Sequence, residues 1–312
     1  MKDFQKDQWA LILGGSSGMG LATADKLSRH GMSICIAHRD RRGAMARIQP
    51  SFDAIAARGV GFRAFNVDAL SAEGRAEVLA GLKDAMGEHG RVRLLLHSIA
   101  FGNLKLLAPY EDGGPRAARE QLAAALGIDV ERVAAAAQQL FNAGDPAFAS
   151  LADPPAYDQS NFLEDEDFTR TVHAMGTSLV GWVQDTLARG LFAADGRVVA
   201  LTSEGNRVAW RGYAAVSAAK AALEAAARSI AVELAPRGLR CNIVQAGVTR
   251  TAALALIPGS NHLAAGALRR NPLGRLTTPE DVANAICLLA TDEAAWINGA
   301  LLAVDGGERN GG

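Results

Sequence analysis

The regular alternation of short apolar segments with alanine-rich amphipathic segments constrains the fold of this chain more than any other feature. The apolar segments are rich in Val, Ile and Leu and lack polar alternation, which is typical of strands buried on both faces of a parallel sheet. Strands are predicted at residues 9–13, 33–37, 61–65, 91–97, 197–202, 239–245 and 300–304, and helices near residues 18–30, 42–58, 72–88, 166–189, 213–234 and 279–290. This order predicts an α/β fold with one doubly wound parallel sheet, whose ligand site lies at the carboxyl ends of the strands.

Length and charge limit the classes of partner. The 312 residues, 49% of them hydrophobic, predict a single domain over residues 1–312 that carries one insertion. The net charge of −1 gives no electrostatic reason to bind nucleic acid or a membrane surface. The first residues are polar and no run approaches the roughly 20 apolar residues of a membrane-spanning helix, so a cytoplasmic location is expected. The widely spaced Cys35, Cys241 and Cys287 indicate buried thiols rather than a disulfide or a metal site.

The stretch at about residues 101–165 interrupts the alternation, because it is far longer than an ordinary connection. Residues 115–126 are predicted to form one helix, and Asp129 is expected to cap a second that runs to Asn142 and stops before Gly144. This insertion is interpreted as a lid, a wall of the substrate site or an oligomer contact; the alternative is a surface helix pair without a catalytic role. Residues 250–271 form a second candidate lid.

A glycine-rich turn follows the first predicted strand and opens the first helix. Glycine allows a tight turn and a close approach of the backbone to a pyrophosphate, and the N-terminus of a helix offers it free N–H groups. The candidate dinucleotide-binding residues of this turn are Gly14, Ser16, Ser17, Gly18, Met19 and Gly20.

The end of the second strand bears on the choice of cofactor. A protein that binds an unphosphorylated adenosine ribose commonly places an acid here, whereas this chain has His38 followed by Arg39, Arg41 and Arg42. Guanidinium groups favour a 2′-phosphate, so NADPH is expected in preference to NADH, although Asp40 is an opposing charge.

Tyr213 and Lys220 lie seven residues apart after the strand that ends at Ser203. On a helix they share a face but are displaced by about 10 Å along the axis. The position four residues before the lysine is Val216, which cannot donate a proton. A phenol displaced in this way suits an acid placed over the carbonyl oxygen of a conjugated C=C–C=O group, two atoms from the carbon that accepts hydride. The spacing therefore favours reduction of a C=C bond over reduction of a ketone.

Several of these motifs together resemble the short-chain dehydrogenase/reductase superfamily, and within it the enoyl-thioester reductases. The resemblance covers roughly residues 8–100 and 160–307. It rests on the glycine turn, on His97-Ser98-Ile99-Ala100, Ser203, Tyr213-x6-Lys220, residues 246–251 and Val304-Asp305-Gly306-Gly307.

The resemblance implies a Rossmann-type fold and assigns a role to each matching residue. Lys220 would hold the nicotinamide ribose, Tyr213 would bond the thioester carbonyl, and Ser203 would donate to the substrate or support Tyr213. The remaining expected cofactor contacts are Ser98 and Ile99 at the nicotinamide, Asn66 and Val67 at the adenine, and Val248, Thr249 and Thr251 at the carboxamide and pyrophosphate.

The activity expected from the resemblance is NADPH-dependent reduction of an enoyl thioester of coenzyme A or an acyl carrier protein, in fatty acid or polyketide biosynthesis. A carbonyl reductase acting on 3-ketoacyl or polyketide thioesters, or a non-catalytic NADP(H)-binding scaffold, are the alternatives. The superfamily forms dimers or tetramers, here through residues 166–189 and 213–234.

One position departs from the resemblance. Glu204 follows the strand-end serine where the best-known enoyl reductases often have a second tyrosine. A carboxylate there would oppose an enolate, so Glu204 is expected to pair with Arg207 or Arg211. The departure, together with the long insertion, indicates a substrate outside housekeeping fatty-acid synthesis, such as a polyketide-type or cyclic enoyl thioester.

Overall fold

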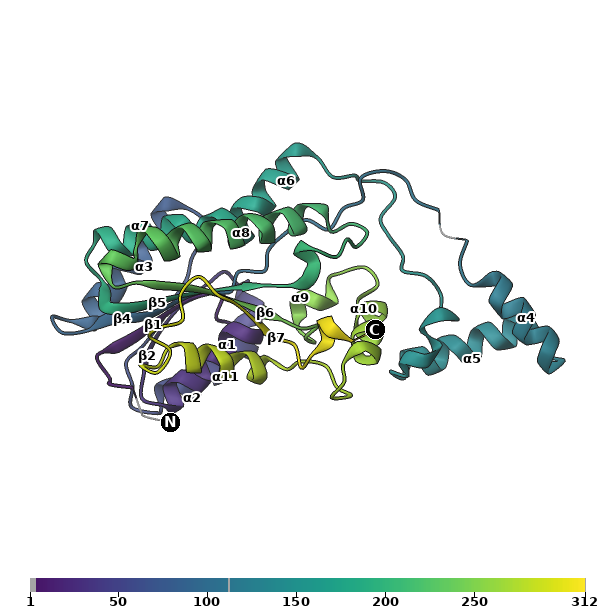
Figure 1. The fold of residues 1–312 in the computed structure, drawn as a ribbon, viewed down its shortest axis with the longest axis horizontal. Helices are drawn as coiled ribbons and strands as arrows, with labels where there is room; N and C mark the ends of the chain where they lie inside the picture. Colours follow the sequence, from purple (N-terminus) through teal and green to yellow (C-terminus); the bar gives the residue numbers. More distant parts are fainter. Residues whose placement is uncertain (1–3, 112, 312) are drawn as a thin grey trace.

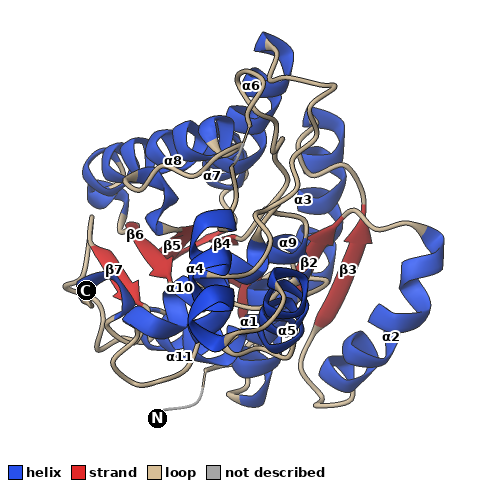
Figure 2. Ribbon diagram, turned by 90° about the vertical axis from the view of Figure 1, so that its right-hand side faces the viewer, coloured by secondary structure: helices blue, strands red, loops and turns tan. Residues whose placement is uncertain are grey.

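The computed structural model describes residues 4–111 and 113–311, and a single parallel sheet forms the centre of the described chain. The sheet has seven strands in the order β3-β2-β1-β4-β5-β6-β7, and every neighbouring pair is parallel (Figures 1 and 2). The strands are β1 Gln8–Leu13, β2 Ser33–His38, β3 Phe62–Asn66, β4 Arg91–His97, β5 Phe192–Thr202, β6 Arg240–Ala246 and β7 Leu301–Val304. The predicted doubly wound parallel sheet is confirmed.

Helices cover both faces of this sheet. Alternate residues of each strand point to opposite faces, so Leu11 and Leu95 enter one core cluster while Ile12 and Leu96 enter the other. The first cluster lies under α3 (Ala72–Met86), α7 (Ser178–Ala188) and α8 (Ala214–Glu233), and the second lies under α1 (Gly18–Arg29), α2 (Arg42–Ala56) and α11 (Pro279–Leu289) (Figure 2). The predicted helix at residues 166–189 consists of α6 (Asp165–Val172), a π-helical turn at His173–Thr177 and α7.

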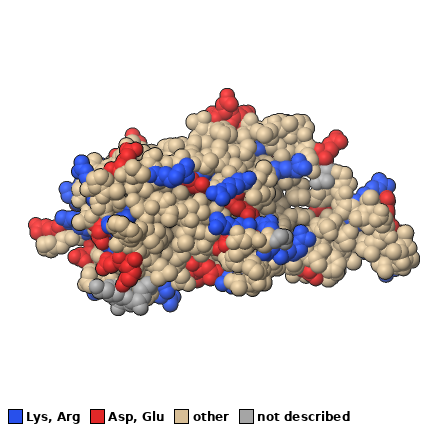
Figure 3. All heavy atoms as spheres, viewed as in Figure 1, with Lys and Arg blue, Asp and Glu red and all other residues tan. Residues whose placement is uncertain are grey.

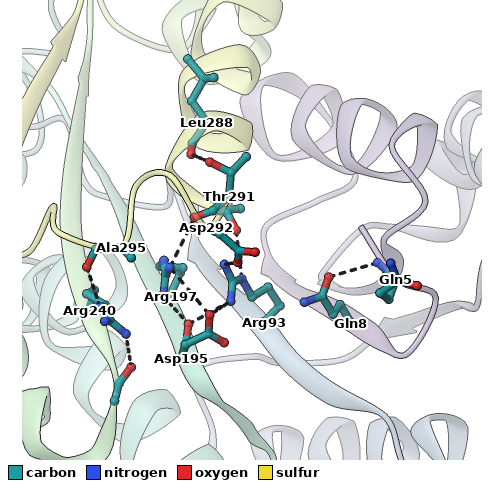
Figure 4. A network of polar contacts seen from close by, with 12 residues as sticks. Gln5, Gln8, Arg93, Asp195, Arg197, Arg240, Leu288, Thr291, Asp292 and Ala295 are labelled. Carbon is teal, nitrogen blue, oxygen red and sulfur yellow. Dashed lines mark hydrogen bonds and ion pairs between the residues drawn. The ribbon is translucent and has the colours of Figure 1, made fainter. Parts of the chain in front are cut away.

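Two buried arginines, Arg93 of β4 and Arg197 of β5, link these strands to the segment that follows α11 (Figure 4). Arg93 forms an ion pair with Asp195, donates to Asp292 Oδ1 at 2.9 Å, and donates through Nε to the Ala290 carbonyl at 2.9 Å. Arg197 Nη2 donates to the Thr291 carbonyl at 3.3 Å. The strands β4 and β5 shift in register between Val92 and Leu94, so β5 begins at Phe192, earlier than predicted.

The insertion contains the two helices that were predicted, α4 (Arg116–Leu126) and α5 (Val130–Asn142), followed by the 3-10 helix η1 (Pro146–Ser150). Asp129 caps α5 by accepting a hydrogen bond of 2.9 Å from the Glu131 N–H. The helix pair stands away from the body on two extended segments (Figure 1), and these segments pair with each other at Leu106 and Phe162.

The second candidate lid forms α9 (Ala252–Ala255) and α10 (Ser260–Arg270), and the insertion packs directly against α10. Phe141 of α5 clusters with Ala152 and Ala265, and its ring lies 4.6 Å from the ring of His262. The His262 Nε2 atom is 2.9 Å from the Asp153 carbonyl. The two candidate lids are therefore joined into one contiguous structure.

Two general properties of the described chain complete the fold. No helix among residues 4–111 and 113–311 has both the length and the apolar character needed to cross a bilayer. The thiols of Cys35, Cys241 and Cys287 are free and buried in the core.

Candidate active site

A continuous groove runs across the carboxyl ends of the strands, from the end of β2 to the start of α8. It consists of a cavity beside α1, called the polar cavity because Ser16, Ser17, Arg39, Asp40 and Arg41 line it, and an apolar cavity beside α8. The residues that line both cavities are Met19, Ser98, Ile99, Ala100, Thr251, Ala253 and Leu256. The groove therefore offers one extended site for a long ligand, at the place where a doubly wound sheet binds dinucleotides.

The glycine turn shapes the polar cavity. Gly14 has a φ of +83°, and a Cβ atom at this position would lie 2.6 Å from the Ser98 carbonyl oxygen. A Cβ atom at Gly20 would lie 2.2 Å from the Gly14 carbonyl oxygen, so α1 could not approach β1 with any side chain there. The N-cap residue Ser17 makes no side-chain capping bond, and the first N–H groups of α1 are left for an anion. The turn thus has the form that a pyrophosphate requires.

Most of the predicted cofactor residues line the groove. Ser16, Ser17, Gly18, Met19, Arg39, Ser98, Ile99, Lys220, Val248, Thr249 and Thr251 do so, together with Gly14. Gly20, Asn66 and Val67 are outside this lining, and Asp68, Ala69 and Leu70 occupy the wall that follows β3. The Asn66 amide instead exchanges hydrogen bonds with the Asp40 backbone, at 3.0 Å and 2.9 Å, and Val67 packs into the core. The strand β3 ends at Asn66, so the lining begins two residues later than the sequence indicated.

The end of β2 is held by local ion pairs. The Nδ1 atom of the buried His38 lies 2.8 Å from Asp40 Oδ2. Asp40, the acid that spoke against NADPH in the sequence, therefore has a partner within the protein. Arg39 donates to Asp68 Oδ2 at 3.1 Å, and its guanidinium lies 5.0 Å from the centre of the Phe101 ring. Arg39 and Arg41 both line the polar cavity.

Tyr213 is the N-cap residue of α8, and Lys220 lies two turns further along the same helix. The phenol is buried, with its ring 5.1 Å from that of Trp210 in an edge-on contact. Gly205 makes room for it, since a Cβ atom there would lie 2.5 Å from Tyr213 Cε1. Val216, which also lines the apolar cavity, is one turn before Lys220. The displacement read from the sequence is therefore present in the structure.

Lys220 is anchored deep in the site. Its ammonium donates to the Leu201 carbonyl at 2.9 Å. Burial lowers the pKa of Lys220 to about 8, and the Glu224 carboxylate opposes this shift. Glu224 is itself buried and accepts hydrogen bonds from Thr202 Oγ1 at 2.7 Å and from Asn206 Nδ2 at 2.5 Å. Sequence reasoning missed Glu224, although an acid one turn after the lysine was a visible signal.

Ser203 and Tyr213 present adjacent hydroxyls to the apolar cavity. Burial raises the pKa of the Tyr213 phenol, and the nearby Ser203 hydroxyl partly offsets that shift. Ser203 Oγ is buried and has no well-aligned hydrogen-bond partner among the described residues. A buried hydroxyl in this condition is suited to bond a ligand oxygen.

Glu204 does not pair with Arg207 or Arg211, contrary to the sequence expectation. Its Oε1 atom accepts a bond of 2.7 Å from Arg270 Nη2, at the end of α10. Arg211 instead stacks over the Tyr110 ring, 3.6 Å from its centre. The partner lies 66 residues along the chain and is brought near only by tertiary folding, so local spacing could not identify it.

The walls of the cavity beside Tyr213 are largely apolar and come from four parts of the chain. The volume of this cavity is about 180 Å³. Its apolar walls include Leu104 from the start of the insertion, Met175 from the π-helical turn, Trp210 and Val216, and Leu254, Leu256 and Ile257 from the segment before α10. Such walls suit an acyl chain rather than a sugar or a nucleotide.

Comparisons with known proteins agree with this architecture. Residues 128–308 match a family model described as Enoyl-(Acyl carrier protein) reductase. Cis-4-hydroxycyclohexanecarboxylate dehydrogenase of Sinomonas cyclohexanicum is 41% identical over 115 residues, 37% of this chain and 45% of that protein. The 3-oxoacyl-acyl-carrier-protein reductase FabG of Escherichia coli is 32% identical over 145 residues, 46% of this chain and 59% of that protein.

A solved structure reproduces the fold over nearly the whole chain. FabI from Candidatus Liberibacter asiaticus aligns with a TM-score of 0.73 at 19% identity, covering 99% of this chain and 98% of that one. The curated relatives above match over only 45% and 59% of their own length. The family model, by contrast, matches more than half of this chain. The chain belongs to the short-chain dehydrogenase/reductase family of oxidoreductases, in the group that this model describes as Enoyl-(Acyl carrier protein) reductase.

Proposed function

We propose that this protein reduces the C=C bond of an enoyl thioester with NADPH. The observation that carries the proposal is the position of Tyr213, at the N-cap of α8, with the inert Val216 in the place one turn before Lys220. A donor displaced from the anchored lysine in this way is suited to bond the thioester oxygen while the hydride arrives at Cβ. The apolar walls of the cavity are compatible with an acyl chain.

The groove fits a dinucleotide cofactor. The glycine turn and the free N-terminus of α1 would hold the pyrophosphate, and Val248, Thr249 and Thr251 would meet the carboxamide side. The Lys220 ammonium would donate to the ribose hydroxyls next to the nicotinamide, with Ser98 and Ile99 beside the ring. The reduced nicotinamide supplies the hydride when it is bound.

Tyr213 and Ser203 would stabilise the negative charge that forms on the substrate during reduction. Two electrons reach Cβ with the hydride, the C=C bond opens, and negative charge passes through Cα to the thioester oxygen. Tyr213 stabilises that oxygen by a hydrogen bond, assisted by Ser203, and a proton from solvent completes the saturated product at Cα. One NADPH and one proton are consumed for each bond reduced.

NADPH is preferred to NADH in this proposal. Arg39 and Arg41 line the polar cavity at the end of β2, where a 2′-phosphate would lie, and Asp40 is already engaged by His38. The kcat/KM values measured with both cofactors test this part, and a preference for NADH would refute it.

A carbonyl reductase remains the second candidate, and one observation favours it. The buried Ser203 hydroxyl adjacent to Tyr213 would also bond a ketone oxygen, and the Escherichia coli relative is named a 3-oxoacyl reductase. The acyl thioester would be carried by coenzyme A or an acyl carrier protein in either case. Association into a dimer or tetramer through the α6–α7 segment and α8 belongs to the same proposal.

The deciding experiment compares oxidation of NADPH with crotonyl-CoA and with acetoacetyl-CoA. Turnover of crotonyl-CoA is expected. Turnover of acetoacetyl-CoA alone would replace the enoyl reductase by the carbonyl reductase, and NADPH binding without turnover of either would indicate a non-catalytic protein.

A further inference from the structure

An ion-paired triad connects α10 to the wall of the substrate cavity. Arg270 is the last residue of α10, and its Nη2 atom is 2.7 Å from Glu204 Oε1 and 3.4 Å from Glu308 Oε1. Glu204 directly follows Ser203 and lines the apolar cavity. Its side chain is only 16% exposed. A carboxylate thus stands beside the hydroxyls that face the reacting oxygen, with one arginine as its cation.

Glu308, the second carboxylate of the triad, does not border the substrate cavity. Glu308 is buried, outside the lining of the cavity, and its Oε2 atom accepts a bond of 3.1 Å from the Val248 N–H. Burial raises the pKa of Glu308, and the neighbouring Glu204 adds to that shift. Glu308 therefore braces the loop after β6 and holds the far side of the Arg270 guanidinium. The carboxylate that borders the substrate is Glu204 alone.

The charge of Glu204 would affect the rate of reduction if Arg270 did not neutralise it. Reduction places negative charge on the substrate oxygen next to Tyr213, in a cavity with few polar walls. Two like charges roughly 8 to 10 Å apart repel strongly enough, at an effective dielectric constant near 20, to change a rate roughly 10- to 50-fold, and an uncompensated Glu204 carboxylate would oppose the step in this way. Basic side chains and fewer acidic ones appear on the surface between the body and the insertion (Figure 3), and Arg270 is the cation that lies within ion-pair distance of Glu204, at 2.7 Å.

We infer that Arg270 is a positioning residue for the reaction, acting by neutralising Glu204 so that negative charge can develop on the substrate oxygen beside Tyr213. This inference rests on the proposed function, because it requires a transition state with charge on that oxygen. It also explains how an acid can occupy this position, since α10 delivers a dedicated cation to it. The insertion contributes indirectly, because Phe141 and Asp153 contact the same helix.

The test is a double-mutant cycle of R270Q and E204Q, followed by steady-state kinetics with crotonyl-CoA and NADPH. R270Q alone is expected to lower kcat about 10- to 50-fold, with a smaller effect on KM. In the E204Q background the same R270Q change is expected to cost less than about threefold, because the carboxylate that borders the substrate cavity has already been removed. R270K, which keeps the cation, is expected to recover most of the loss.

The outcomes separate this inference from the proposed function. An equal cost of R270Q in both backgrounds would show that Arg270 only holds α10 in place, and no cost in either would show that Glu204 needs no cation; each overturns the inference. NADPH affinity and thermal midpoints of all variants control for misfolding. If wild-type protein reduces only acetoacetyl-CoA, the enoyl proposal fails and the cycle is measured on that ketone, where charge also develops on an oxygen. Turnover of neither thioester would overturn both.

Discussion

Glu224 accepts a hydrogen bond of 2.7 Å from Thr202 Oγ1, which joins the middle of α8 to the last residue of β5. The same carboxylate accepts from Asn206, so the turn between those two donors is fixed at both ends. Ser203 lies in this turn. One buried acid therefore sets the position of the serine and, through its charge, supports the ammonium of Lys220 one helical turn earlier.

Glu224→Gln is expected to lower the pKa of Lys220 below its present value of about 8, because the carboxylate is the group that opposes the effect of burial. The pH at which NADPH affinity falls should therefore move to a lower value than in the wild-type protein. Binding titrations across a pH series measure this shift. Glu233→Gln, at the exposed end of the same helix, is the matched control and should leave the midpoint in place.

The pH dependence of cofactor binding should follow the Lys220 ammonium. Since its pKa is lowered from 10.5 to about 8, the donor loses its proton as pH rises through 8, and NADPH should bind more weakly above that pH. Lys220→Met should bind weakly at every pH, with this transition absent. The stability of the protein without cofactor should change in the opposite direction. Between about pH 8 and 10.5 Lys220 is protonated in the unfolded chain but not in the folded one, so the free energy of unfolding should rise with pH in that window.

Tyr213→Phe should reduce kcat by about two orders of magnitude, the loss typical of removing one donor to a developing oxyanion. NADPH affinity should change little, because the lysine and the glycine turn remain. Stopped-flow kinetics and fluorescence titration measure the two quantities. Tyr157→Phe, within the insertion, controls for the loss of a phenol as such. Nearly full activity of the Tyr213 variant would show that another group stabilises the oxygen.

Gly14→Ala should destabilise the fold and abolish tight NADPH binding, because a positive φ and a 2.6 Å approach to the Ser98 carbonyl coincide at this residue. Gly59→Ala is a matched control, since Gly59 also has a positive φ of 74° but a Cβ atom there would meet no neighbour within 4 Å. The control should cost about 1–2 kcal/mol of unfolding free energy from backbone strain alone. Urea denaturation should find a clearly larger loss for Gly14→Ala, and equal losses would contradict the proposed clash.

Phe141→Ala should loosen the contact between the insertion and α10, because Phe141 is the large buried side chain of that small cluster. Faster proteolysis within the insertion and a raised KM for the thioester are expected, with NADPH affinity unchanged. Leu140→Ala, one residue earlier and 42% exposed, provides the comparison. If both variants behave alike, the packing of the insertion on α10 has no influence on the substrate site.

The features that could be predicted from the sequence are those with local signals. Apolar runs located the strands, Asp129 and Gly144 marked the ends of α5, and the Tyr213–Lys220 spacing gave the displacement seen on α8. Each of these depends on residues close together in the chain, where periodicity and capping preferences are strong.

Contacts between distant segments could not be obtained in this way. The partner of Glu204 was expected nearby but is Arg270, and the buried Arg93 and Arg197 within their strands were not anticipated. After β3 the cavity is lined by Asp68, Ala69 and Leu70, because Asn66 bonds the Asp40 backbone and Val67 packs against the core. These features depend on how elements meet, which no local pattern records.

The pairing of Leu106 with Phe162 has a consequence for how such a chain can change. The insertion leaves the sheet-and-helix body and returns to it at two points that lie next to each other. An insertion with adjoining ends can be lengthened, shortened or exchanged during evolution while the order of the strands in the sheet stays the same. Because its tip rests on α10, each exchange would present the same chemistry with a differently shaped entrance.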